Sequence, residues 1–198
     1  MHAYLGSCSA FSAVTAVEEI YKITTKKLIF LLVHHLVHCE KMNKGSCVGP
    51  YVGAFNFIQK NGIIFEAANI YTTKDGKCVV KENSLLLFID SYKKVRENEV
   101  FLLKVVANLP VSVAIDTHGF DSEDYCRKMF VQNSGTNLDH KMTVVGYRQT
   151  LDDIEDWILR NSCGPMYGEG MYMRMLCGAS NSGGLCGITT NASYLIIY

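Results

Sequence analysis

The feature that most constrains the fold is a glycine turn that delivers a cysteine into a helix, Gly6-Ser7-Cys8-Ser9-Ala10-Phe11-Ser12. Ser7 is a favourable N-cap residue, and apolar residues then recur at helical spacing, at Ala10, Ala13, Val14, Val17, Ile20 and Tyr21. Cys8 is therefore expected in the first turn, where backbone N–H groups and the helix dipole favour negative charge. The stretch predicts either a nucleophilic thiolate or a small buried hydrophobic residue.

Composition excludes several classes of function. The chain has 198 residues, and 19 basic side chains balance 19 acidic ones. This balance gives no electrostatic footprint for nucleic acid or for a membrane surface. The longest uninterrupted apolar run, 28–33, is too short to span a bilayer. We therefore expect neither a nucleic-acid nor a membrane partner, and we also expect the protein to be a monomer.

Two downstream motifs give the cysteine a chemical context. His140 follows Leu138-Asp139 and precedes an alternating apolar run, and Asn161 ends Trp157-Ile158-Leu159-Arg160. They lie 140 − 8 = 132 and 161 − 8 = 153 residues after Cys8. This order and spacing of Cys, His and Asn is typical of cysteine peptidases. Together with the segments 18–39, 98–116 and 168–174, the motifs make the sequence resemble the papain-like cysteine peptidases, above all the plant members.

The resemblance implies an α+β fold of two lobes with an active-site cleft between them. Residues 1–90 would form a helical left lobe that carries the nucleophile, and 91–198 an antiparallel β-barrel right lobe that carries His140 and Asn161. The sequence itself changes periodicity near residue 90. Before it, helices are predicted over 31–38 and over 50–61, with Gly62 as C-cap. After it, a helix over 97–108 precedes strands at 111–115, 142–146 and 172–174.

The resemblance also implies residue roles. Cys8 and His140 would share a proton as a thiolate–imidazolium pair, and Asn161 would orient the imidazole. The Cys8 backbone N–H would form one half of the oxyanion hole, and His2 stands where the family has the second donor, a Gln. Substrate-binding positions fall on Gly49, Pro50, Tyr51, Val52, Asp139, Lys141 and Asn191.

Several positions depart from the family pattern. Pro50 has no N–H to donate to a bound peptide. Ser9, Cys163 and Tyr167 stand where the family has Trp residues that pack around the site. We expect these changes to lower activity below that of a typical member.

Eight cysteines suit an oxidising compartment. By resemblance, Cys39 and Cys78 form a disulfide. Cys47 matches half of a second bridge whose other half is Leu5, and Cys186 matches half of a third whose other half is Ser134. The remaining cysteines have no family counterpart, and their state stays open: Cys126, Cys163 and Cys177.

Family members are typically vacuolar, lysosomal or extracellular and are made with a signal peptide and a propeptide. No signal segment precedes Cys8 here, so we expect a chain that lacks its amino-terminal segment, and its compartment stays open.

Three functions remain in competition. The first is a papain-like endopeptidase without a cofactor, acting on peptides or proteins through Cys8, His140 and Asn161. The second is a homologue with the same fold that has lost hydrolysis. The third is a metal-binding or redox thiol protein, since His34 and His38 lie one helical turn apart at a spacing compatible with zinc. No second ligand pair accompanies these histidines, so we predict no metal site and treat them as solvated side chains.

Overall fold

The computed structural model describes residues 7–40, 52–66, 78, 80, 84–119, 129–131, 135–149, 155–162, 169–178 and 183–197. Helix α1 (Cys8–Thr25) is the longest element of this part of the chain and confirms the helix predicted after the glycine turn. Its alanines and branched residues form one apolar face, and Ala13, Ala16 and Val17 are completely buried. Lys26 ends the helix in the left-handed region, with φ of 62°.

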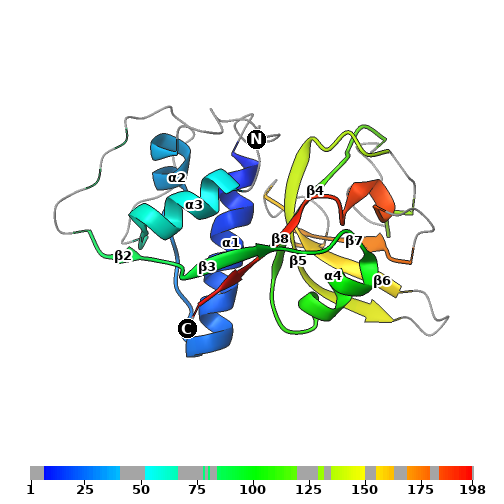
Figure 1. The fold of residues 1–198 in the computed structure, drawn as a ribbon, viewed down its shortest axis with the longest axis horizontal. Helices are drawn as coiled ribbons and strands as arrows, with labels where there is room; N and C mark the ends of the chain where they lie inside the picture. The colour runs from blue at the N-terminus through cyan, green and yellow to red at the C-terminus, as the bar shows by residue number, and fades with distance from the viewer. Residues whose placement is uncertain are drawn as a thin grey trace.

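Two shorter helices pack beside α1 on one side (Figure 1). They are α2 (Val33–Cys39) and α3 (Val52–Asn61), close to the predicted ranges. Ala54, Phe55 and Ile58 bury the predicted apolar face of α3. Gly62, at φ of +73°, donates its N–H to Ile58 O and closes this helix, as predicted. A short antiparallel pair, β1 (Ile63–Ile64) with β2 (Leu86–Leu87), completes this region.

The other half of the described chain is an antiparallel sheet of six strands, in the order β3-β8-β4-β5-β6-β7. The strands are β3 (Ser91–Lys94), β4 (Val111–Ile115), β5 (His140–Gln149), β6 (Glu155–Arg160), β7 (Tyr172–Leu176) and β8 (Ala192–Ile196). Helix α4 (Glu99–Val106) precedes β4, and the Asn98 side chain caps it by accepting a hydrogen bond from Val100 N. A 3₁₀ turn, Leu185–Gly187, precedes β8.

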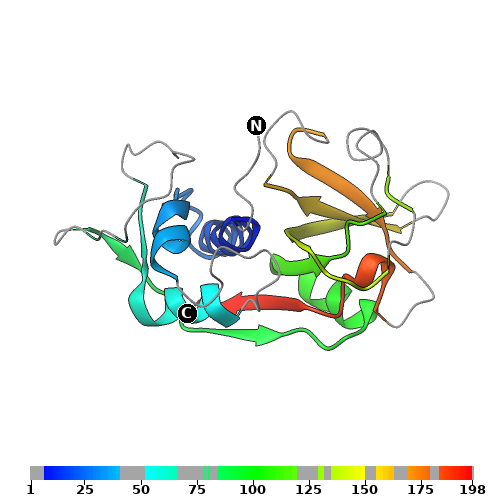
Figure 2. The same cartoon turned by 90° about the horizontal axis from the view of Figure 1, so that it is seen from above.

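Two hydrophobic cores hold the molecule together. One lies among α1, α2 and α3, and the other lies between the sheet and α4. Figure 2 looks along α1, which lies between α2–α3 and the strands. Ala114 and Leu195 of the sheet belong to the helical core. The boundary near residue 90 therefore stays a prediction, because the chain crosses between the two cores more than once.

The structure differs from the sequence predictions at two places. Ser7 occupies the N-cap position of α1 as predicted, but its backbone is already helical and its side chain makes no capping hydrogen bond. Strand β4 was expected to alternate, yet Ser112 and Ala114 are buried as well as Val111, Val113 and Ile115. Its second face is covered because it packs against α1. Among the helices of the described chain, none is long and apolar enough to traverse a bilayer.

Candidate active site

His140 and Asn161 come together at the ends of neighbouring strands. His140 is the first residue of β5, and Asn161 directly follows β6. The antiparallel register of the two strands pairs Thr143 with Arg160, so their adjacent ends lie side by side. His140 Nε2 lies 2.9 Å from Asn161 Oδ1. Because an amide oxygen can only accept, Nε2 carries the proton and Nδ1 keeps its lone pair, which suits it as a base.

The surroundings of His140 favour the neutral ring. Burial lowers the pKa of His140, although the hydrogen bond to Asn161 and the charge of Asp139 both oppose this effect. Asn161 is itself buried and its Oδ1 also accepts from Ser162 N at 2.7 Å. The amide is therefore held from two directions, and it fixes the orientation of the imidazole.

Cys8 lies in the first turn of α1, which packs against β5. One turn later, Ser12 Oγ donates to Met142 O at 2.7 Å and contacts the hydroxyls of Ser112 and Thr143. All of these residues are buried. These hydrogen bonds hold the start of α1 against β5 two residues beyond His140. The helix that carries Cys8 and the strand that carries His140 are therefore packed against each other at this point.

Cys8 is in a disulfide in this structure, and its residue is only 4% exposed. A disulfide sulfur has no thiol proton to share, so the thiolate–imidazolium pair expected from the sequence belongs to the reduced protein and stays a prediction.

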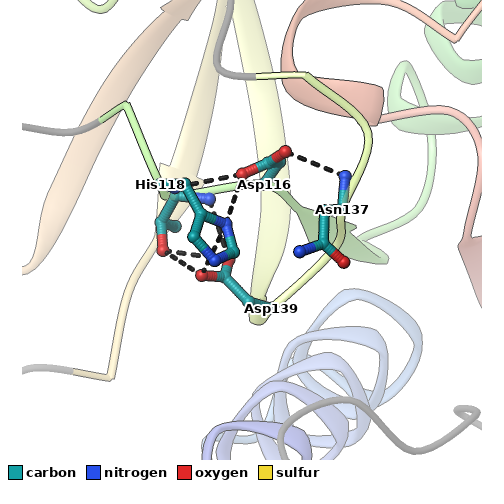
Figure 3. A network of polar contacts seen from close by, with 5 residues as sticks. Asp116, His118, Asn137 and Asp139 are labelled. Atoms are coloured by element: carbon teal, nitrogen blue, oxygen red, sulfur yellow. Dashed lines mark hydrogen bonds and ion pairs between the residues drawn. The ribbon is translucent and has the colours of Figure 1, made fainter.

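Figure 3 shows a polar network of Asp116, His118, Asn137 and Asp139, the last of which directly precedes His140 in the chain. Asp116, at the end of β4, accepts from His118 Nδ1 at 2.8 Å and from the backbone N–H of His118 and of Asn137. Asp139 accepts from the N–H and hydroxyl of Thr117 and lies 3.4 Å from the ring of His118. Burial raises the pKa of Asp116, but these hydrogen bonds outweigh it and the pKa is lowered overall. The pKa of the exposed His118 is raised by its bond to Asp116 and by the charge of Asp139.

This network is also where the described residues could hold a cation. Asp116, His118 and Asp139 offer ligand atoms within 4.8 Å of one another. Each of them already takes part in the hydrogen bonds above, so the arrangement is satisfied as a polar network. His34 and His38 lie together on α2, with ring centroids 5.2 Å apart, and no third ligand joins them within the described residues.

A cavity of about 190 Å³ opens between α1, the segment before α2, and the strands β5 and β6. Asn161 lines it, so it lies directly beside the candidate catalytic residues. Its charged lining residues are Glu18, Glu66, Lys141 and Arg160, with His34 at one side. Lys141 is the most buried of them at 1% exposure, and burial lowers its pKa to about 8. Burial also raises the pKa of Glu18 to about 7, even though its carboxylate accepts from Leu31 N.

Some of the other predicted site residues are described by the structure, and others are not. The Asn191 carbonyl accepts from Ala114 N at 3.0 Å, and Asp139 belongs to the network in Figure 3. Val52 is the first residue of α3. The following predictions fall outside the described residues: His2, Cys47, Gly49, Pro50, Tyr51, Cys126 and Cys163. The Cys39–Cys78 disulfide is confirmed, with Cα atoms 4.7 Å apart.

Sequence reasoning missed three features: the hydroxyl cluster around Ser12, the network around Asp116, and the charged cavity. Each joins residues that are far apart in sequence, and Ser12 and Ser112 differ by 100 positions. A weak signal was present for the network, because Asp116 directly follows a buried strand and Asp139 immediately precedes His140. Polar residues at the ends of neighbouring strands often converge, but the partner cannot be chosen without the strand order.

Comparison with known proteins decides the family. A profile described as papain family cysteine protease matches residues 2–196. The chain belongs to the papain family of cysteine proteases. It is 47% identical over 195 residues to vignain from Ricinus communis, and 45% identical to a KDEL-tailed cysteine endopeptidase from Arabidopsis thaliana. Each alignment covers 96% of this chain and 54% of the relative, so the chain spans about half the length of the curated relatives it matches.

The fold comparison agrees. The bromelain protease from Ananas comosus, solved in complex with the inhibitor E64, superposes with a TM-score of 0.85 at 33% identity. The match covers 98% of this chain and 90% of that structure. The predicted α+β papain-like fold is therefore confirmed.

Proposed function

We propose that this chain, once Cys8 is reduced, hydrolyses peptide bonds as a thiol endopeptidase. Cys8 is the nucleophile, His140 takes its proton and later protonates the leaving amine, and Asn161 orients the ring. The observation that carries the proposal is the hydrogen bond from His140 Nε2 to Asn161 Oδ1, which leaves Nδ1 as the base. The fastening of α1 to β5 through Ser12 supports the role of Cys8.

The substrate is a peptide or an unfolded protein segment, and Lys141 influences the choice. This lysine directly follows His140 and lines the cavity beside Asn161. Below a pH of about 8 it is a buried cation whose charged form Glu40 favours, and an acidic side chain nearby would add to that stabilisation. We therefore infer that an acidic side chain entering this cavity is favoured over an apolar one.

An oxidising compartment suits the proposed enzyme. The Cys39–Cys78 disulfide is present, and such bonds persist mainly in secreted proteins or in the secretory route. One relative is described as KDEL-tailed, which concerns that protein and is compatible with this location.

The test is covalent labelling of the reduced full chain with the epoxysuccinyl inhibitor E-64, which alkylates activated thiols. We expect Cys8 to be labelled, and we expect His140→Ala to slow labelling by about 100-fold or more because the thiolate loses its partner. His38→Ala, on α2, is the matched control and should label like the parent chain. Equal labelling of the parent chain and His140→Ala would contradict the proposal and indicate a homologue without hydrolytic chemistry.

A further inference from the structure

Asn191 begins a motif that the proposed catalysis does not use. The run Asn191-Ala192-Ser193 has the form Asn-X-Ser, in which X is not proline, and this form is the acceptor sequence for N-linked glycosylation. No other asparagine of the sequence has Ser or Thr two residues after it. The sequence therefore offers one such acceptor, and it stands directly before β8.

The surroundings of Asn191 suit a modified side chain. The residue is partly exposed, in the turn that leads into β8. Its backbone is fixed, because its carbonyl accepts from Ala114 N at 3.0 Å. Within the described residues its side-chain amide makes no hydrogen bond, whereas the amide of Asn161 is buried and accepts from His140 and Ser162. The amide nitrogen of Asn191 is therefore available for a new bond.

A row of paired residues connects Asn191 with the candidate site. Val113 of β4 pairs with Ala192 of β8, and the next pair in the same register is Ala114 with Asn191. Ala114 also pairs with Lys141 on β5. Residues paired across antiparallel strands point to the same face of a sheet. Because neighbouring strands lie about 4.8 Å apart, the backbone of Asn191 is about 10 Å from that of Lys141.

We propose that Asn191 is the acceptor of an N-linked glycan, and that this glycan stands beside the cavity lined by Lys141. The donor is an oligosaccharide joined through a diphosphate to a polyprenyl lipid. The amide nitrogen bonds to the anomeric carbon of the first sugar, and the bond from that carbon to the diphosphate oxygen breaks. The lipid diphosphate leaves, and the amide gives up one proton to the transferring enzyme. The step needs the secretory route, which the Cys39–Cys78 disulfide supports.

Ser193 indicates when the transfer takes place. This residue belongs to the acceptor sequence, yet it is buried on β8 between Lys94 and Ser112 of the two neighbouring strands. A transferring enzyme reaches its hydroxyl only before β8 has paired, so the glycan is added before folding is complete. Asn191 itself lies outside β8 and is partly exposed, so the folded sheet keeps its strand pairing with the glycan attached.

A glycan at this place selects substrates by size. N-linked glycans are bulky, and this one begins on the same face of the sheet as Lys141. A short peptide passes beside it, whereas a large protein is obstructed. This consequence rests on the proposed peptidase function, but the presence of the glycan does not.

The first test is direct mapping of the glycan. The full chain is secreted from yeast behind a cleavable signal peptide, treated with peptide-N-glycosidase F in heavy-oxygen water, and mapped by mass spectrometry. We expect conversion of Asn191 to a heavy-oxygen aspartate in the parent chain, and complete loss of this signal in Ser193→Ala and in Asn191→Gln. Ser193→Thr keeps the acceptor sequence and is the matched control, so it should keep the glycan. An unmodified Asn191 in secreted chain that contains the Cys39–Cys78 disulfide would overturn the proposal.

The second test compares Ser193→Thr with Ser193→Ala, since both variants keep Asn191 and differ in the glycan. After reduction, the Ser193→Ala variant should cleave a denatured protein faster, relative to a short peptide, than Ser193→Thr does. Trimming with endoglycosidase H, which leaves one sugar on Asn191, should abolish this difference. Equal ratios in the two untrimmed variants would overturn the selection by size.

The glycan and the peptidase activity fail in different ways. A glycan on Asn191 of a chain that hydrolyses neither substrate would support the modification and overturn the peptidase. Hydrolysis by a secreted chain whose Asn191 is unmodified would support the peptidase and overturn the modification.

Discussion

The two sides of the molecule that carry the proposed catalytic residues differ in how far they match the family. On the strand side, His140 and Asn161 occupy adjacent strand ends and are already hydrogen-bonded to each other. On the helix side, Cys8 has its family position in the first turn of α1, but its sulfur is held in a disulfide. His2 and Pro50, which the resemblance places on the same side, have replaced residues that the family uses.

This difference indicates which kind of local structure holds the side chains of the candidate site in a fixed geometry. Strand pairing fixes His140 and Asn161 through a ladder of backbone hydrogen bonds that does not depend on side chains. The state of Cys8 depends on which other cysteines the sequence provides.

Among the variants that test this difference between the strand side and the helix side, Asn161→Ala is expected to have the largest effect. Removing the acceptor of the His140 ring should reduce kcat/KM of the reduced enzyme by about 10- to 100-fold, equivalent to about 1.5–3 kcal/mol for a hydrogen bond to a charged group. Peptide hydrolysis kinetics measure this directly. Asn108→Ala, at an exposed position after α4, is the control. An unchanged rate in Asn161→Ala would show that the strand side is not the preformed part of the site.

A change in selectivity is expected next, from Lys141→Ala. The buried ammonium should favour acidic over apolar side chains in the cavity, and the variant should lose this preference by about 10-fold, or about 1.4 kcal/mol. Paired substrates that differ only by Glu or Leu measure the ratio. Lys104→Ala on α4 serves as control, since this lysine lies over the ring of Phe101 at the surface. A parent chain that prefers Leu at this position would contradict the role given to Lys141.

The smallest effect concerns stability, and it comes from Glu18 on α1. Burial raises the pKa of Glu18 from 4.5 to about 7, so the folded protein binds this proton more tightly than the unfolded chain does. Its contribution to stability is therefore fully present below pH 4.5 and is lost as the pH rises to about 7. Glu18→Gln removes this loss, and we expect the variant to be about 1 kcal/mol more stable at pH 8, after allowance for solvent screening.

Thermal melts of the Glu18→Gln variant at pH 4.5, 6 and 8 check this prediction, and the advantage should grow with pH. The exposed Glu97, which pairs with Lys94 at the surface, provides the control through Glu97→Gln. An advantage independent of pH would mean that charge burial at Glu18 is not the cause.

Local patterns predicted the parts of the fold that local physics controls. The apolar periodicity after Cys8 predicted α1, and Gly62 marked the end of α3 through its left-handed conformation. Ser7 stands at the predicted N-cap position, but its side chain makes no capping hydrogen bond and its backbone is already helical, which a preference for residue type does not report. Burial of both faces of β4 depended on α1, an element about 90 residues away, and it left no local pattern in the sequence.

The same distinction between local patterns and contacts of distant residues applies to the candidate site. His140 and Asn161 were identified from motif order and spacing, and the structure joins them by a hydrogen bond. The disulfide state of Cys8 could not be read from its helix, because it depends on the rest of the cysteine pattern. The charged cavity was missed, since the sequence does not say that Glu18 of α1 and Lys141 of β5 line one space.

The hydroxyl cluster of Ser12, Ser112 and Thr143 has a mechanical consequence. If the helices and the sheet swung apart, three buried oxygens would lose their partners, at a cost of about 1–3 kcal/mol for each group. The separation of α1 and β5 is therefore fixed by the fold and does not depend on a bound ligand. If the chain cuts peptide bonds as proposed, a compactly folded substrate would have to unfold locally to reach His140 beside this fixed contact.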